Sequence, residues 1–303
     1  MEGPGAVLDP ELLERLASLT VAARRAVAGA RSGMHRSPHR GASVVFVEHR
    51  EYRAGDDIRA LDWRAFARLD RPIVKRYEHE TQWRSTLVLD GSASMSYGAP
   101  ITKADHAATL LGAIAFLLLQ QGDATGAHRV ATGSLEAVPA RTRGTHLGHL
   151  LAALAVRPRK AEPTDLGASL DAVAEGSGRR GLVVIASDLL DLTPEGQVRE
   201  RVWSSLERLA QRGHEVRVFQ VLHPDELELP FEGPTRFVGL EGEGHVDADP
   251  DGLRGRYVTE VQRFVEECRT RCLAAGARHR LVRTDESIDS VLHESLTRSE
   301  RRR

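Results

Sequence analysis

The sequence predicts an α/β protein with a doubly wound, mostly parallel sheet and helices on both faces. Residues 182–186 form an uninterrupted apolar run bounded by turn residues, which is typical of a central parallel strand buried on both faces. Residues 86–89 form a second short apolar run that begins with a threonine. Strand and helix patterns alternate from Ser85 to the C-terminus, as in sheets built from repeated strand, helix and strand units. Each of the two apolar runs leads into a turn that contains an aspartate.

The charges of the 303-residue chain almost cancel, with 42 Lys+Arg against 43 Asp+Glu. There is no overall positive field to attract nucleic acid or an anionic membrane, so we expect neither as a partner. The most apolar run, residues 107–119, is shorter than the ~20 residues that a bilayer span requires. The N-terminus also lacks the pattern of a signal peptide. These features predict a cytoplasmic protein with no membrane span.

The first 83 residues differ in composition from the rest of the chain, and their patterns predict two smaller structural parts. A helix is expected to begin at the capping sequence Asp9-Pro10-Glu11, which has an N-cap residue and a proline at the first helical position. Farther on, Ser, His, Gly and Arg are dense, and strand patterns occur at residues 44–47 and 73–77. The predicted domains are an N-terminal helix at 1–32, a small β-rich module at 33–83 and the α/β domain at 84–300.

The remaining elements of the α/β domain follow in order from their patterns. Residues 103–121 are apolar nearly all round, as a helix packed between layers must be. A hairpin pattern follows at 126–132 and 135–138, and Thr193-Pro194-Glu195 predicts the start of a helix whose apolar stripe includes Val198. The other expected elements are helices at 145–156, 165–175, 253–275 and 287–297, strands at 216–221 and 280–283, and a hairpin at 236–240 and 245–247.

The turn after the first central strand has the sequence DGSAS, residues 90–94. Asp90, Ser92 and Ser94 place three hard oxygen donors on one turn, which is a pattern of metal ligands. Ligands of doubly wound sheets bind beyond the carboxyl ends of the strands, near the switch in winding direction. If the two central strands are neighbours, Asp188 joins the same cluster, and a loop threonine could complete a site suited to Mg²⁺. The alternative is structural: the serines cap the next helix and Asp90 accepts hydrogen bonds from turn amides.

Three segments resemble known families. The motif at residues 90–94, followed by Met95, resembles the metal-ion-dependent adhesion site of von Willebrand factor A domains, and PTDL at residues 163–166 resembles the threonine loop of those domains. The sequence REYRAGDDIRALDW at residues 50–63 resembles more specifically the bacterial DUF58 family. Together these resemblances cover most of the chain from residue 33 to residue 300.

The resemblance implies a set of metal ligands. Ser92, Ser94 and Thr164 would bind the ion directly, and Asp90 and Asp188 would act directly or through water, with Mg²⁺ expected and Mn²⁺ possible. Thr145 competes with Thr164 for the threonine role. Thr164 is preferred because one helix then separates it from the strand that ends at Asp188, which is the order in von Willebrand factor A domains.

The resemblance also implies a function. DUF58 proteins are similar to partners of MoxR-type AAA+ ATPases, in systems thought to mature or remodel other proteins, and many are membrane anchored, which this chain is not expected to be. We expect a non-enzymatic, Mg²⁺-dependent protein-interaction domain whose ion offers an open position to an acidic residue of the ATPase or its client. Met95 and Tyr97, beside the metal turn, are the expected partner contacts.

An enzymatic alternative is a metal-dependent phosphoester hydrolase, in which Asp90 and Asp188 hold the ion and a bound water attacks the substrate. The sequence shows no phosphate-binding glycine loop near the metal turn, and His106 is the nearby histidine. Ser92 stands where a haloacid-dehalogenase-like phosphatase needs a second acid. Neither serine lies in a Gly-x-Ser-x-Gly elbow.

Overall fold

The computed structural model describes most of the α/β domain and two strands of the preceding module. The described residues are Val21, Ala23, Arg25 and Val27, and the ranges 45–51, 73–78, 84–131, 134–156, 164–178, 180–193, 196–242 and 244–300. Contacts divide the chain into two units, residues 38–82 and residues 1–37 with 83–303.

The smaller unit contains two antiparallel strands, β1 (Val45–Glu51) and β2 (Ile73–Glu78). They confirm the strand patterns predicted at 44–47 and 73–77, although β1 extends four residues farther than predicted. The DUF58-like sequence between them lies almost entirely outside the described residues, so the boundaries of the module stay a prediction.

The larger unit is organised around a six-stranded sheet in the order β10-β7-β6-β3-β4-β5. Only the β4–β5 pair is antiparallel within this sheet. When the six strands are renumbered 1 to 6 along the chain and read from β5 to β10, their order is 3-2-1-4-5-6. In this order the winding direction reverses between strands 1 and 4. The strands are β3 (Arg84–Leu89), β4 (Ala124–Ala131), β5 (Ser134–Arg141), β6 (Gly181–Ser187), β7 (His214–Leu222) and β10 (Ala277–Arg283). The predicted doubly wound, mostly parallel sheet is confirmed, and its switch point lies between β3 and β6.

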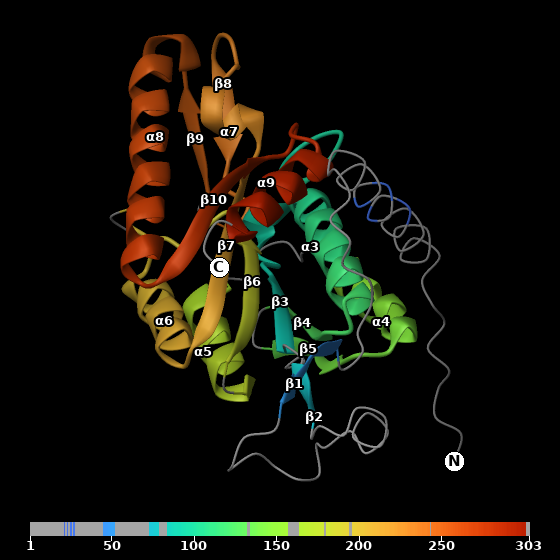
Figure 1. The fold of residues 1–303 in the computed structure, drawn as a ribbon. Helices are drawn as coiled ribbons and strands as arrows, with labels where there is room; N and C mark the ends of the chain where they lie inside the picture. Colours follow the sequence, from blue (N-terminus) through green and yellow to red (C-terminus); the bar gives the residue numbers. More distant parts are fainter. Residues whose placement is uncertain are drawn as a thin grey trace, which may run out of the picture. The chain divides into compact units, whose positions relative to one another are not determined.

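Helices cover both faces of the sheet (Figure 1). One face packs against α3 (Lys103–Gln120), α4 (Leu147–Leu154) and α9 (Ile288–Glu300), and the other against α5 (Leu166–Gly176), α6 (Glu200–Gln211) and α8 (Pro250–Ala274). Leu87 and Val88 are consecutive on β3, and each is fully buried in a different one of the two hydrophobic cores. This two-sided burial explains why residues 87–89 of β3 and 182–186 of β6 are all apolar.

Several element boundaries differ from the sequence predictions. The helix expected after Thr193 begins only at Glu200, so the prediction that Val198 lies on it was wrong. Val198 instead pairs with Leu192 in an isolated bridge, and the Thr193 amide donates to the carbonyl of Gln197 at 2.7 Å, closing a turn before the helix. The long helix α8 begins at Pro250, because Asp249 caps it by accepting from the Asp251 amide.

Two further elements follow the strand β7. A short helix, α7 (Pro224–Glu228), was missed by the sequence analysis, and its cap is the unusual residue His223, whose side chain accepts from the Asp225 amide. The predicted hairpin is present as β8 (Thr235–Val238) and β9 (His245–Ala248), which pair antiparallel.

The N-terminal helix is described only in part. Ala23 and Val27 are helical and buried in the core on the α3 side of the sheet, and the predicted helix start at residues 9–11 lies outside the described residues. Within the described part of the chain, no helix combines the length and the apolar character that crossing a bilayer requires.

Candidate metal centre

The ends of β3 and β6 bring two aspartates to one edge of the sheet. The strands are paired in parallel up to Leu89 and Ala186, and the Asp90 amide continues the ladder by donating to the carbonyl of Ala186 at 2.9 Å. Asp90 and Asp188 are both buried. They lie at the switch point, where ligands of doubly wound sheets bind.

The turn after Asp90 is compact because glycine occupies its second position. A Cβ on Gly91 would lie 2.1 Å from the carbonyl oxygen of Val130 on β4, which no other residue type can tolerate without displacing the backbone. Asp90 Oδ1 accepts a hydrogen bond from the Ser92 amide at 2.9 Å. The Ser92 and Ser94 hydroxyl oxygens are 2.9 Å apart.

The structural alternative for this motif is right about Asp90, which does accept from a turn amide, and wrong about the serines. Ser92 precedes the 3-10 helix Ala93–Ser96, but its side chain makes no capping hydrogen bond. The following helix, α3, is capped instead by Thr102, which accepts from the Asp105 amide. The serine hydroxyls therefore face each other without a capping role.

Ser187 links the two strand ends, and sequence analysis did not select it. Its hydroxyl donates to Asp90 Oδ2 at 2.5 Å and accepts from the Leu189 amide at 2.9 Å. Burial raises the pKa of Asp90 to about 6, and the nearby charge of Asp188 adds to this, against the hydrogen bonds from Ser187 and Ser92. The signal in the sequence was a hydroxyl residue immediately before the strand-end aspartate.

Asp188 is held by a lysine that is completely buried. Lys103 is 0% exposed, and its Nζ lies 2.8 Å from Asp188 Oδ2 and 2.6 Å from Glu226 Oε1. Burial acts to lower the pKa of Lys103, but the two carboxylates outweigh it and the pKa is raised, so the lysine is charged. The other oxygen of Asp188, Oδ1, accepts from the Leu190 amide at 3.0 Å.

Sequence analysis missed Lys103 and Glu226 as site residues. Lys103 left a signal, because it is one of the few charged residues of a helix that is largely apolar. Glu226 left none, because it lies on α7, a helix whose existence was not predicted.

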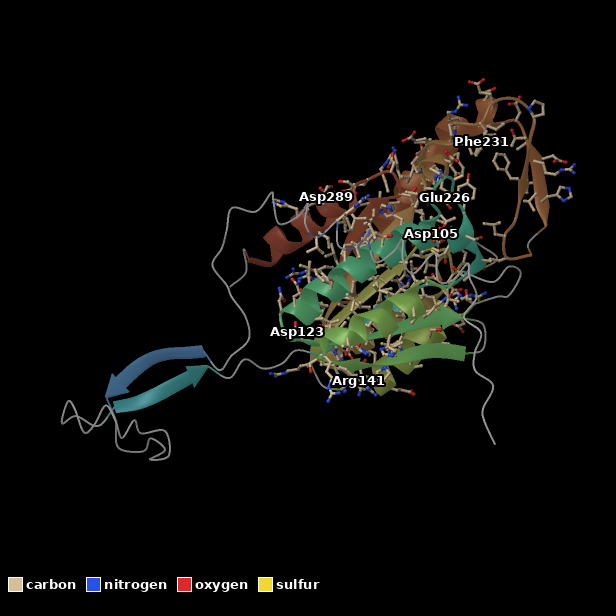
Figure 2. The ribbon with its side chains drawn as sticks, turned by 90° about the vertical axis from the view of Figure 1, so that its right-hand side faces the viewer. Asp105, Asp123, Arg141, Glu226, Phe231 and Asp289 are labelled. Atoms are coloured by element: carbon tan, nitrogen blue, oxygen red, sulfur yellow. The ribbon has the colours of Figure 1, made fainter. Side chains whose placement is uncertain are left out.

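The two candidate threonines lie at different edges of the sheet. Strand β5 runs antiparallel to its neighbour, and its last residue, Arg141, pairs with Thr125 near the start of β4. Thr145 follows in an exposed turn at that amino edge, and Figure 2 shows Arg141 well away from Glu226 at the carboxyl edge. Thr145 is thus far from the aspartates in the sheet.

Thr164 lies half-buried just before α5. The loop that carries it is tied to the loop after Asp188, because the Leu166 amide donates to Asp191 Oδ2 at 3.1 Å. This places the Thr164 loop at the same edge of the sheet as the loop after Asp188. The role of Thr164 as a metal ligand stays a prediction.

The residues present fit a small divalent cation. Two neighbouring ligands of an octahedral ion with bonds of about 2.1 Å are about 3.0 Å apart, close to the 2.9 Å between the Ser92 and Ser94 hydroxyl oxygens. Two buried carboxylates at one strand edge also favour a cation. Among the described residues, no cluster of three or more His, Cys, Asp or Glu side chains is arranged to hold a metal. An ion here would therefore depend on hydroxyl oxygens and water besides the aspartates.

The structure corrects one of the two expected partner contacts. Met95 is 0% exposed and belongs to the hydrophobic core, so the expectation that it touches a partner was wrong. Its position after the motif suggested exposure, but the 3-10 turn directs it inward. Tyr97 is only half-buried, and its hydroxyl donates to Asp225 Oδ2 at 3.1 Å.

Comparison with known proteins identifies the family. The model of the family described as "Protein of unknown function DUF58" matches residues 48–267. Uncharacterized proteins of Mycobacterium bovis and Mycobacterium tuberculosis are each 32% identical over 232 residues, which cover 76% of this chain and 71% of theirs. The chain therefore belongs to the DUF58 family, as its sequence predicted.

Solved structures with similarity to the chain include three proteins. The conserved hypothetical protein BatB from Bacteroides thetaiotaomicron has a TM-score of 0.45 and 16% identity over 72% of this chain and 99% of its own. An aerotolerance-related membrane protein from Bacteroides fragilis has a TM-score of 0.44 and 18% identity over 71% and 97%. The SpRpn10 VWA domain has a TM-score of 0.38 and 11% identity over 71% and 95%.

The raised pKa of Asp90 predicts a pH dependence for the metal-free protein. The folded state keeps the Asp90 proton up to about pH 6, above the usual value of 3.8. Between these values the folded state binds more protons than the unfolded state, so stability is lost as the pH rises. Relative to Asp90→Asn, which does not titrate, the wild type should lose up to about 3 kcal/mol of unfolding free energy over this range.

Urea denaturation of both proteins in EDTA, from about pH 4 to about pH 7, measures this difference. The raised pKa of Asp90 would be contradicted if the difference in unfolding free energy between the two proteins stayed constant with pH. It would also be contradicted if the wild type gained stability relative to Asp90→Asn as the pH rose.

The buried position of Lys103 predicts a large loss of stability for Lys103→Met in metal-free protein. Removal of one partner from a buried ion pair leaves an uncompensated charge and costs about 3–5 kcal/mol. The double variant Lys103→Met/Asp188→Asn should recover part of this loss, because the amide needs no counter-ion. Urea denaturation in EDTA measures both values, and a single variant within about 1 kcal/mol of the wild type would contradict the interpretation.

Proposed function

We propose that this DUF58 protein is a non-enzymatic, Mg²⁺-dependent protein-interaction domain. The observation that carries the proposal is the pair of facing serine hydroxyls beside two buried aspartates at the switch point of the sheet. When bound, Mg²⁺ would supply a Lewis-acidic position open to a carboxylate of another protein. Mn²⁺ is a second candidate, because it also accepts octahedral coordination by oxygen.

The proposed roles of the residues follow from their contacts. The hydroxyls of Ser92 and Ser94 would bind the ion directly, and Thr164 would add a third hydroxyl from its neighbouring loop. Asp90 and Asp188 supply negative charge and are fixed by Ser187 and Lys103, so their oxygens need little reorganisation when a cation arrives.

The described residues near the site favour docking over catalysis. His106, the nearby histidine in the sequence, is buried in α3 and has its pKa lowered to about 4 by burial, against the carboxylates of Glu286 and Asp285. His223 lies at the same edge of the sheet, but its Nδ1 accepts from the Asp225 amide and its ring packs edge-on against Tyr97. Neither histidine is placed as a general base for the alternative phosphoester hydrolase built on Asp90 and Asp188.

The proposed partner is a MoxR-type AAA+ ATPase or a client of that ATPase, and protein maturation or remodelling is the proposed process. The partner must supply an acidic side chain for the ion. It must also bury apolar surface around the contact, because one carboxylate and one metal ion do not account for the affinity of a specific interface. Tyr97, half-buried beside the metal turn, is the proposed aromatic contact.

Co-purification with the MoxR-type ATPase of the same bacterium tests this function. The wild type should recover the ATPase in Mg²⁺ and should lose most of it in EDTA. Ser92→Ala/Ser94→Ala in Mg²⁺ should behave as the wild type does in EDTA, because both changes remove the open metal position.

Threonine variants provide a matched control. Thr164→Ala should reduce recovery, whereas Thr145→Ala, at the opposite edge of the sheet, should not. Equal recovery of the ATPase by the wild type and the double serine variant would remove the metal from the interface. A loss with Thr145→Ala but not with Thr164→Ala would reverse the assignment of the threonine.

A further inference from the structure

A third acidic side chain reaches the metal turn from a distant part of the chain. The Ser94 amide donates to Glu241 Oε1 at 3.4 Å, which is long for a hydrogen bond. Glu241 lies at the tip of the β8–β9 hairpin, between Val238, where β8 ends, and His245, where β9 begins. Ser94 is also one of the residues whose hydroxyl would bind the ion. A carboxylate of this chain therefore already lies beside one of the proposed metal ligands.

The hairpin belongs to an arm, residues 224–248, that is firmly anchored at its base. Lys103 joins Glu226 of α7 to Asp188. Arg254, on α8, donates to the carbonyls of Leu229 and Phe231, both at 2.9 Å. Figure 1 shows α7, β8 and β9 beside the first turns of α8. The base of the arm is thus tied to the metal site through the lysine.

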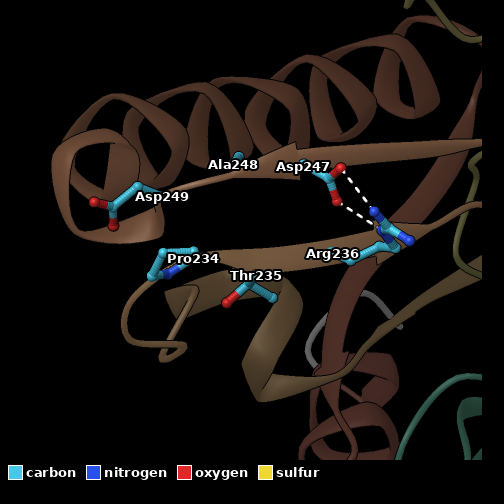
Figure 3. A pocket seen from close by; sticks show the side chains of 6 residues that line it. All are labelled: Pro234, Thr235, Arg236, Asp247, Ala248 and Asp249. Carbon is cyan, nitrogen blue, oxygen red and sulfur yellow. Dashed lines mark hydrogen bonds and ion pairs between the residues drawn. The ribbon is translucent and has the colours of Figure 1, made fainter.

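The outer part of the arm is held less firmly. Strands β8 and β9 have only four residues each. Arg236 and Asp247 form a bidentate ion pair across them (Figure 3). Val238 and Val246 are 65% and 64% exposed, so these apolar side chains find little packing. An isolated two-stranded hairpin is only marginally stable, so we expect the tip to move more easily than the base, although Phe237 on β8 packs in a T-shaped contact with Phe231.

The backbone of the tip supports this interpretation. Gly242 and Gly244 have φ angles of 93° and 94°, which glycine adopts without strain. The Gly239 amide donates to the carbonyl of Gly244 at 2.8 Å and closes the loop. Because this bond joins the two strands close to Glu241, movement of the hairpin would carry this carboxylate toward or away from the metal turn.

The negative charge of Glu241 indicates a role beyond accepting a hydrogen bond from the Ser94 amide. A neutral glutamine would also accept a hydrogen bond from the Ser94 amide, although a weaker one. Glu241 brings a further carboxylate to a turn that already lies beside two buried aspartates, and such a gathering of negative charge is unfavourable unless a cation is bound.

We propose that Glu241 is an internal ligand that occupies the open position of the metal ion until a partner displaces it. This inference rests on the proposed function of the site. The arm then regulates docking, because the partner must compete with a carboxylate that is already tethered to the domain. Docking would move the tip of the hairpin and leave its base on Lys103.

Mn²⁺ binding to the 303-residue chain tests the proposal without a partner. Glu241→Gln keeps an acceptor for the Ser94 amide and removes the charge, and Glu232→Gln removes one exposed charge from the same arm as a control. Electron paramagnetic resonance of free Mn²⁺ gives the affinity, and water-proton relaxation gives the water bound to the ion. Thermal unfolding in EDTA verifies that all three proteins are folded.

Glu241→Gln should bind Mn²⁺ about tenfold more weakly than the wild type, and the bound ion should carry more water. Glu232→Gln should match the wild type in both measurements. Equal affinity and hydration in all three proteins would overturn the role of Glu241 and leave the metal site intact. Equal weakening by both variants would also overturn it, by assigning the effect to net charge. Absence of Mn²⁺ binding to the wild type would reject the metal site itself, and this inference with it.

Discussion

The close approach of two buried aspartates at the switch point is the constraint on which the site depends. Strand pairing brings Asp90 and Asp188 to one edge, and burial makes two neighbouring negative charges unfavourable. The protein compensates in different ways. Lys103 pairs with Asp188, whereas Asp90 receives hydrogen bonds but has a raised pKa. The remaining imbalance around Asp90 is what a divalent cation would relieve.

The fold holds this unfavourable arrangement because its supports are rigid. Strands β3 and β6 are buried on both faces, and Gly91 allows the turn to approach β4 within a distance that excludes any side chain. Ser187 and Lys103 then fix one carboxylate each. A site built on such elements needs little reorganisation when a ligand binds, which is consistent with the proposed docking of a partner.

Much of the fold and part of the site could be predicted from the sequence. The two apolar runs identified the central strands, and their alternation with helices identified the doubly wound sheet. Because parallel strands share their carboxyl edge, Asp90 and Asp188 could be placed together once the strands were expected to be neighbours. The DUF58-like sequence at residues 50–63 predicted the family.

The parts that could not be predicted depend on contacts between distant segments. Lys103 meets Glu226 across 123 positions of the chain, and Glu241 meets Ser94 across 147, so no local pattern records either pair. Met95 was misplaced for a related reason. Its neighbours in the sequence are polar, but the direction of one 3-10 turn decided that it faces the core.

The central claim is that the turn after β3 binds a divalent cation, and thermal unfolding of EDTA-treated protein tests it most directly. A ligand that binds only the folded state must stabilise it. Saturating Mg²⁺ or Mn²⁺ should therefore raise the unfolding temperature of the wild type and leave that of Asp90→Ala unchanged. An unfolding temperature of the wild type that does not respond to either saturating metal would contradict the account.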